Sequence, residues 1–122
     1  MEIKNIWESD NFLRRQMTGR IQASEVIDSI LKLSGDERFD NLKFILGDWS
    51  QAELEHFTGE DVKQLCVIAE TISKSNAQIR NAIVTGNKEA NQAVAQLYVL
   101  TKPLKWKVKV FQNIENARDW LS

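Results

Sequence analysis

One short stretch in the middle of the chain holds most of the side chains that could carry out covalent chemistry. His56 is the only histidine, and the hydroxyls of Ser50 and Thr58 stand on either side of it. An imidazole next to a hydroxyl can activate that oxygen as a nucleophile when a third group orients the ring. No acid is clearly placed to orient His56, so a small hydrolase is the least supported function and we expect no enzyme activity.

Thr58 and Gly59 stand where a helix is expected to begin. The Thr58 hydroxyl can cap that helix by accepting an amide hydrogen bond, and this is the favoured interpretation. The capping box is expected to be imperfect, because Asp61 stands where glutamate or glutamine is usual. The alternative is that Thr58 is a phospho-acceptor. Free helix amides would stabilise the phosphate, but Glu60 and Asp61 would repel it.

A candidate binding site surrounds the end of a predicted buried strand, residues 42–46, and the beginning of that helix. Its members are Asp48, Trp49, Ser50, His56, Phe57, Thr58 and Gly59. Open α/β sheets usually bind ligands beyond the carboxyl ends of their strands, which is where Asp48, Trp49 and Ser50 stand. The favoured alternative is structural: Trp49 packs against the next helix, and Ser50 caps a short turn over residues 51–57.

Other polar motifs give no sign of nucleotide or nucleic-acid binding. The turn at residues 85–88 lacks the glycines of a dinucleotide or P-loop site, so a plain turn capped by Asn87 is expected. Four lysines precede or alternate along the last predicted strand: Lys102, Lys105, Lys107 and Lys109. Lysines of this kind usually protect a sheet edge, and no exposed aromatic residues are interleaved with them.

Length and composition predict one soluble domain over residues 1–122. The 14.0 kDa chain has 43% hydrophobic and 27% charged residues, which is ordinary for a protein with a single core. A net charge of -1 creates no overall attraction to nucleic acid or anionic membranes. The sequence shows no signal-peptide pattern and no run of the roughly 20 apolar residues that would span a bilayer. We therefore expect a cytoplasmic protein.

The supply of metal-ligating and thiol side chains is small. With one cysteine and one histidine, neither an internal disulfide nor a structural zinc site can be assembled, so we expect no metal and no cofactor. Cys66 falls on the apolar face of a predicted helix. A small buried residue is therefore expected there, rather than a reactive thiol.

Hydrophobic periodicity predicts the elements that would position these residues. Two short strands, at residues 3–8 and 12–18, flank a polar turn and are expected to pair as a hairpin. In the second strand Leu13, Arg15 and Met17 point to one face. That mixed pattern favours a place near a sheet edge.

The rest of the chain alternates between helices and buried strands. Ser24 is expected to cap the first helix. The strand at residues 42–46 is expected to end at Gly47 and Asp48, and a second buried strand follows at 82–84. Later elements are helices at 60–75 and 90–100, a strand at 106–110, and a closing helix capped by Asn113. The helix at 90–100 is expected to turn inward Ala90, Ala93, Val94, Leu97 and Leu100.

The order ββαβαβαβα resembles the STAS domain, in particular the SpoIIAA-like family of small bacterial proteins. The resemblance spans the chain and rests on LKFILGD at residues 42–48, RNAIVT at 80–85 and the closing FQNIENARDWL at 111–121. It implies an α/β fold: a mixed, mostly parallel five-stranded sheet with four main helices.

The resemblance also implies a function without catalysis. STAS anti-anti-sigma factors carry an Asp-Ser-Ser-Gly turn whose phosphorylated serine switches partner binding. The matching stretch here is His56, Phe57, Thr58 and Gly59, which keeps the hydroxyl but loses the acid. The leading hypothesis is therefore a regulatory or protein-interaction module that recognises a partner through residues 49–61 and is modulated at Thr58. Exposed aromatic residues at a sheet edge would indicate a homodimer.

The alternative function is a carrier of a small apolar or lipid-like ligand. SpoIIAA-like proteins resemble the CRAL-TRIO lipid-transfer domains in topology, which implies a pocket between the sheet and the helices. The residues expected to line it are Trp7, Phe44, Trp49, Phe57 and Leu97. An apolar pocket would favour the carrier, whereas a closed core beneath an exposed helix face would favour the interaction module.

Overall fold

The computed structural model describes residues 2–101 and 105–122, so Lys102 lies outside the described residues. Five strands form one sheet, and their order in the sheet follows the chain. They are β1 (Glu2–Ser9), β2 (Phe12–Arg20), β3 (Phe44–Glu53), β4 (Arg80–Val84) and β5 (Lys107–Phe111). β1 is antiparallel to β2, and all other neighbours are parallel. The predicted hairpin and the mixed, mostly parallel sheet are confirmed.

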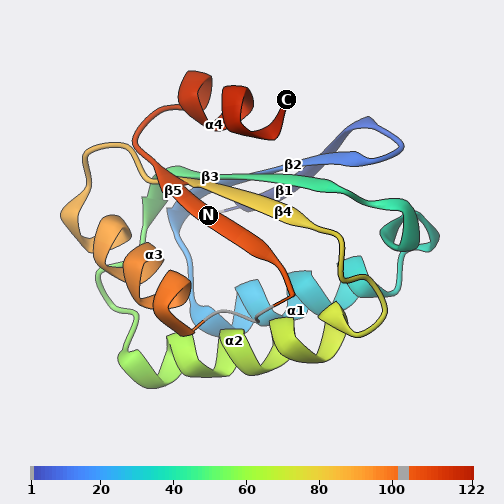
Figure 1. The fold of residues 1–122 in the computed structure, drawn as a ribbon. Helices are drawn as coiled ribbons and strands as arrows, with labels where there is room; N and C mark the ends of the chain where they lie inside the picture. The colour runs from blue at the N-terminus through green and yellow to red at the C-terminus, as the bar shows by residue number, and fades with distance from the viewer. Residues whose placement is uncertain (1, 102–104) are drawn as a thin grey trace.

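Helices cover the two faces of the sheet unequally (Figure 1). Three of them form a layer on one face: α1 (Ala23–Ser34), α2 (Gly59–Ser73) and α3 (Glu89–Thr101). On the other face α4 (Ile114–Leu121) packs against β3, β4 and β5. A short 3-10 helix, η1 (Glu37–Asn41), connects α1 to β3 and buries Phe39. The predicted single-domain α/β architecture is confirmed.

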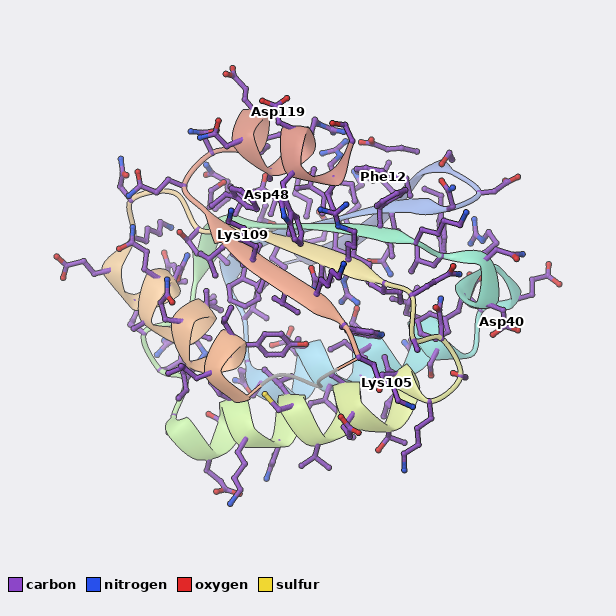
Figure 2. The ribbon with its side chains drawn as sticks, viewed as in Figure 1. Phe12, Asp40, Asp48, Lys105, Lys109 and Asp119 are labelled. Atoms are coloured by element: carbon purple, nitrogen blue, oxygen red, sulfur yellow. The ribbon has the colours of Figure 1, made fainter. Side chains whose placement is uncertain are left out.

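The alternation of side chains along the strands divides the core into two clusters. The larger cluster lies between the sheet and the three-helix layer and includes Leu13, Ile45 and Ile83. The smaller cluster lies under α4 and consists of Leu46, Ala82, Val84, Ala117 and Leu121. At its margin the Arg80 guanidinium lies 4.4 Å from the Trp120 ring centroid and donates to the Trp120 carbonyl at 2.8 Å. Figure 2 shows Phe12 at the hairpin end of this same face.

β3 is longer than its apolar run indicates. The expected strand end at Gly47 and Asp48 is wrong, because the second half of β2 continues to pair with β3 after an irregularity in the register. Thr18, for example, pairs with Gln51. Ser50 therefore lies inside a strand, and the prediction that it caps a turn is also wrong.

Helix caps were predicted correctly at one end of the chain and not at the other. Asn113 caps α4 as expected, accepting a backbone hydrogen bond at 2.9 Å. The cap of α1 is Gln22 instead of Ser24. Gln22 has extended backbone geometry, and its N–H donates to the Glu25 side chain at 3.1 Å. Glutamine is not among the favoured capping residues. The start of α1 is set instead by the Glu25 carboxylate, which accepts the backbone N–H of Gln22.

α3 turns a different face inward than the sequence indicates. The helix begins two residues after Asn87, so the prediction that Asn87 caps it is wrong. Val94 and Tyr98 are buried, whereas Leu97 is partly exposed and Leu100 is 81% exposed. Ala93 is exposed as well, so the inward placement of Ala93, Leu97 and Leu100 is wrong, because contacts with the sheet and with α2 fix the rotation of the helix.

Candidate functional site

Asp48 and Ser50 form a tight polar pair in the middle of β3. The backbone N–H and the hydroxyl of Ser50 both donate to Asp48 Oδ1, at 3.0 and 2.6 Å. Asp48 is buried. Gly86 packs against this pair: its φ of +64° favours glycine, and a Cβ there would lie 3.3 Å from Ser50 Cβ. The geometry holds the Ser50 hydroxyl on the Asp48 carboxylate and away from His56.

His56 has no catalytic partner in the described part of the chain. Both ring nitrogens are buried without a hydrogen-bond partner, and the ring packs edge-on against Phe57 with centroids 5.4 Å apart. The Ser50 hydroxyl donates to an acid, and the Thr58 hydroxyl belongs to a helix cap. The structure therefore brings neither hydroxyl to the imidazole, and hydrolysis gains no support from the geometry.

Thr58 caps α2 in the way the favoured interpretation predicts. Its Oγ1 accepts from the backbone N–H of Asp61 at 3.1 Å, and Asp61 Oδ2 accepts from the backbone N–H of Thr58 at 2.9 Å. The capping box is thus complete, which corrects the expectation of an imperfect one: the shorter aspartate still reaches the cap amide. Thr58, Gly59 and Glu60 are exposed.

We expect Thr58→Ala to lower the free energy of unfolding by about 1 kcal/mol, because it removes the side-chain half of this capping box. Thr58→Ser keeps an acceptor oxygen and should stay within about 0.5 kcal/mol of the wild type. Urea unfolding followed by circular dichroism measures both. Equal stability of the alanine and wild-type proteins would show that the cap contributes nothing.

The end of β3 is fixed by side chains from the start of α3. Asn91 Nδ2 donates to the carbonyls of Trp49 and Ala52, at 2.8 and 3.0 Å. Lys88 Nζ also donates to the Ala52 carbonyl, at 2.9 Å. The indole of Trp49 packs beside Gly47, where a Cβ would lie 3.4 Å from the ring nitrogen. Trp49 is thereby held between the sheet and the helix layer.

A cavity of about 70 Å³ lies between the sheet and the three-helix layer. Most of its lining is apolar, with side chains from all three helices and from β2, β3 and β4. Two tryptophans, Trp49 and Trp106, line it. Packed interiors contain few voids larger than a water molecule, so a cavity of this size is a distinctive feature of the fold.

The cavity is built from residues other than most of those predicted. Of the five expected lining residues, Trp49 lines it. Trp7 lies on the edge strand beneath the Arg38 guanidinium, 4.2 Å from the ring centroid. Phe44 packs in the cluster under α4, Phe57 against the main core, and Leu97 faces an outer groove. The cavity lies between the sheet and the helices, where a pocket was expected, but most of the residues that line it were not predicted.

Among the residues that the structure describes, Arg15 is the one cationic side chain lining this cavity, and it is 5% exposed. Its Nη2 donates to the Ser29 hydroxyl of α1, while its Nε has no hydrogen-bond partner. No ion pair joins Arg15 to a carboxylate among the described residues. Burial lowers the pKa of Arg15 to about 10, with the nearby Tyr98 acting in the opposite direction. Burial likewise raises the pKa of the Tyr98 phenol.

Asn81 of β4 supplies a second unpartnered polar group at the cavity. Its Oδ1 is buried and accepts no hydrogen bond within the described residues. Buried polar groups are normally paired, because an unpaired one costs about 1–3 kcal/mol. Together with the Nε of Arg15, this leaves two unmet hydrogen-bonding groups beside an otherwise apolar space.

Arg15 was missing from the sequence-based candidates, although a signal was present. The strand alternation put Arg15 on the same face as Leu13 and Met17, both of which are buried. A charged residue between two core positions on one face indicates a buried charge. The mixed pattern was used only to predict a place near a sheet edge. That place is confirmed, because β2 lies next to the edge strand β1.

An outer groove runs between α2 and α3. It begins at Gly59 and is lined by exposed apolar residues, among them Val67, which is 58% exposed, and Leu97. Cys66 also lines the groove, but it is 7% exposed, in line with the expected buried position. On the other side of the molecule, β5 forms a sheet edge with Lys107 and Lys109 exposed, as predicted for edge-protecting lysines.

Comparisons with known proteins identify the fold. Neither models of known families nor curated protein sequences match the chain. A solved structure does: an uncharacterized protein of the DUF3478 family, with a SpoIIAA-like fold, from Shewanella loihica PV-4. The likeness has a TM-score of 0.58 at 16% identity and covers 99% of this chain and 93% of the other. The chain therefore has a SpoIIAA-like fold, as its resemblance implied.

Among residues 2–101 and 105–122, no set of three or more histidine, cysteine, aspartate or glutamate side chains could hold a metal ion. Within those same ranges, no helix combines the length and the apolar character needed to cross a membrane.

Proposed function

We propose that this protein is a non-enzymatic binding module that holds a small, largely apolar ligand in the cavity between the sheet and the helix layer. The observation that carries the proposal is the cavity itself, since it lies where a carrier with this topology would need one and is lined mostly by apolar side chains. From the sequence, the interaction module was the leading hypothesis and the carrier the alternative. The apolar cavity reverses that order, because an apolar pocket was the feature expected to favour a carrier.

The second candidate is a protein-interaction module resembling STAS proteins. The groove between α2 and α3 supports it, because Val67 and Leu97 present apolar surface that begins at Gly59. Within residues 49–61, Trp49 lines the inner cavity and Phe57 packs on the core, so a partner would contact mainly the start of α2. A modification of Thr58 would act there, and a second copy of the chain is one partner that this surface could accept.

Native mass spectrometry of gently purified protein separates these two candidates. We expect a small additional mass that disappears on denaturation, because the ligand is held without a covalent bond. Val26→Phe should abolish that mass by filling the cavity that Val26 lines. Ile27→Phe is the matched control on the same helix, since Ile27 is absent from the cavity wall and lies at an outer groove.

The alternative outcomes are equally specific. A bare chain with no added mass would count against the carrier. A second polypeptide, or a dimer of this chain, would favour the interaction module. A phosphoryl group on Thr58 would support modulation of that module at the start of α2.

A further inference from the structure

We propose that the ligand of this cavity is a small carboxylate with a short apolar tail, whose carboxylate pairs with the buried Arg15. The inference rests on the proposed function and adds the chemical class of the ligand. Its basis is a buried guanidinium that lines an apolar cavity and has a free N–H donor.

The neighbours of Arg15 do not supply a counter-ion. α1 contributes the Ser29 hydroxyl, α3 the phenol of Tyr98, and β4 the amide of Asn81. The lining from α2 is apolar, with Leu65 and Ile72. None of these groups carries a negative charge at neutral pH. A buried charge without a partner is strongly unfavourable, so the site is incomplete until an anion supplies the missing pair.

Guanidinium geometry favours a carboxylate over larger anions. The five N–H donors of arginine lie in one plane and match the two oxygens of a carboxylate in a fork. A phosphate presents more oxygens and more charge than this wall can satisfy. The Asn81 amide can add one further bond, because rotation of its side chain exchanges the oxygen and nitrogen positions.

Cavity size limits the tail. An apolar cavity of about 150 Å³ holds benzene, and this one measures about 70 Å³. Benzene has six carbon atoms, so at the same volume per atom this cavity takes about three non-hydrogen atoms. Acetate, with four, comes nearest to that size, and its methyl group would lie against Met17, Val26 and Leu65. Propionate, with five, fits only if the wall moves outward, and hexanoate exceeds the space.

The test compares propionate with propionamide, which has the same shape and no charge, by NMR titration of isotope-labelled protein. We expect shifts at the amides of Arg15 and its neighbours, and about ten- to a hundredfold weaker binding of propionamide, because the charge-assisted hydrogen bonds are lost. Hexanoate should bind more weakly than propionate.

Two neighbouring arginines provide a matched pair of variants. Arg15→Met should bind propionate and propionamide equally. Arg14→Met should keep the wild-type preference, because Arg14 points to the other face and pairs with Glu8 at 3.1 Å. If Arg15→Met fails to fold, Arg15→Lys carries the same test: it keeps the charge without the fork and should retain part of the preference.

Each contrary result has one meaning. Equal binding of propionate and propionamide to the wild type would overturn the carboxylate assignment and keep the carrier. Binding of neither, with the cavity amides unmoved, would overturn both proposals. Propionate binding that survives in Arg15→Met would overturn the role of Arg15. Inorganic phosphate that binds as tightly as propionate and depends equally on Arg15 would overturn the choice of a carboxylate.

Discussion

Arg15→Met should raise the free energy of unfolding of the ligand-free protein by about 1–3 kcal/mol. Most substitutions of a buried residue destabilise, but here the wild-type side chain is a charge in a largely apolar wall, with no carboxylate partner in the described part of the chain. Methionine has a similar length and flexible apolar atoms that can fill the same space. The variant loses the bond to the Ser29 hydroxyl, a smaller loss than the gain from removing the charge.

Urea unfolding at neutral pH measures this effect. An unchanged slope of the free energy of unfolding against urea concentration would show that the unfolded state is unaffected. Arg14→Met is again the control: it removes a partly exposed ion pair with Glu8, so a change of at most about 1 kcal/mol is expected. A loss of stability above about 1 kcal/mol in Arg15→Met would mean that the guanidinium stabilises the fold in its own right. A gain together with lost propionate binding would indicate a residue kept for binding at the expense of stability.

Asn76→Ala should lower the free energy of unfolding by about 3 kcal/mol, through the opposite mechanism. Asn76 follows α2 and is 5% exposed. Its Nδ2 donates to the carbonyls of Phe39 and Leu42 at 2.7 and 2.8 Å, which ties η1 to the segment before β4. Its Oδ1 accepts from the backbone N–H of Gln78 at 3.1 Å. Alanine would leave the Leu42 carbonyl and the Gln78 N–H without these partners, at about 1–3 kcal/mol each, whereas the Phe39 carbonyl would keep its bond from the Leu42 N–H at 3.1 Å.

The same unfolding experiment tests this prediction. Asn41→Ala, at an exposed asparagine in η1, is the control and should change stability by about 0.5 kcal/mol or less. Asn76→Asp should be at least as destabilising as the alanine variant, because it sets a carboxylate oxygen against the two carbonyl oxygens. A change below about 1 kcal/mol in Asn76→Ala would show that the freed Leu42 carbonyl and Gln78 N–H find other partners.

The elements that sequence predicted well are those whose signals are local. Thr58 and Asn113 carry their capping chemistry in the side chain itself, so both helix starts followed from residue type. The length of β3 did not, because its second half is held by pairing with β2, which lies some thirty residues earlier in the chain. The start of α1 was missed for a related reason: Gln22 is an unusual cap that depends on Glu25.

The candidate site was harder to predict than the fold. Trp49 was correctly selected as a residue of interest, but its role beside the cavity depends on how three helices pack over the sheet. A cavity arises from the misfit of many side chains, which spacing along one element does not reveal. Arg15 could have been found from its alternation with Leu13 and Met17. That Arg15 lies beside a hydroxyl and a phenol instead of an acid depends on the packing of α1, which supplies Ser29, and of α3, which supplies Tyr98.

The distribution of the tryptophans gives the cavity a built-in optical reporter. Trp49 and Trp106 line it, whereas Trp7 and Trp120 lie beneath the guanidinium groups of Arg38 and Arg80, away from the cavity. Indole emission responds to the polarity and charge of its immediate surroundings. An anion entering the cavity would thus change the fluorescence of two of the four tryptophans, while the other two serve as an internal reference. Occupancy of the cavity can therefore be followed by intrinsic fluorescence without a dye or a label.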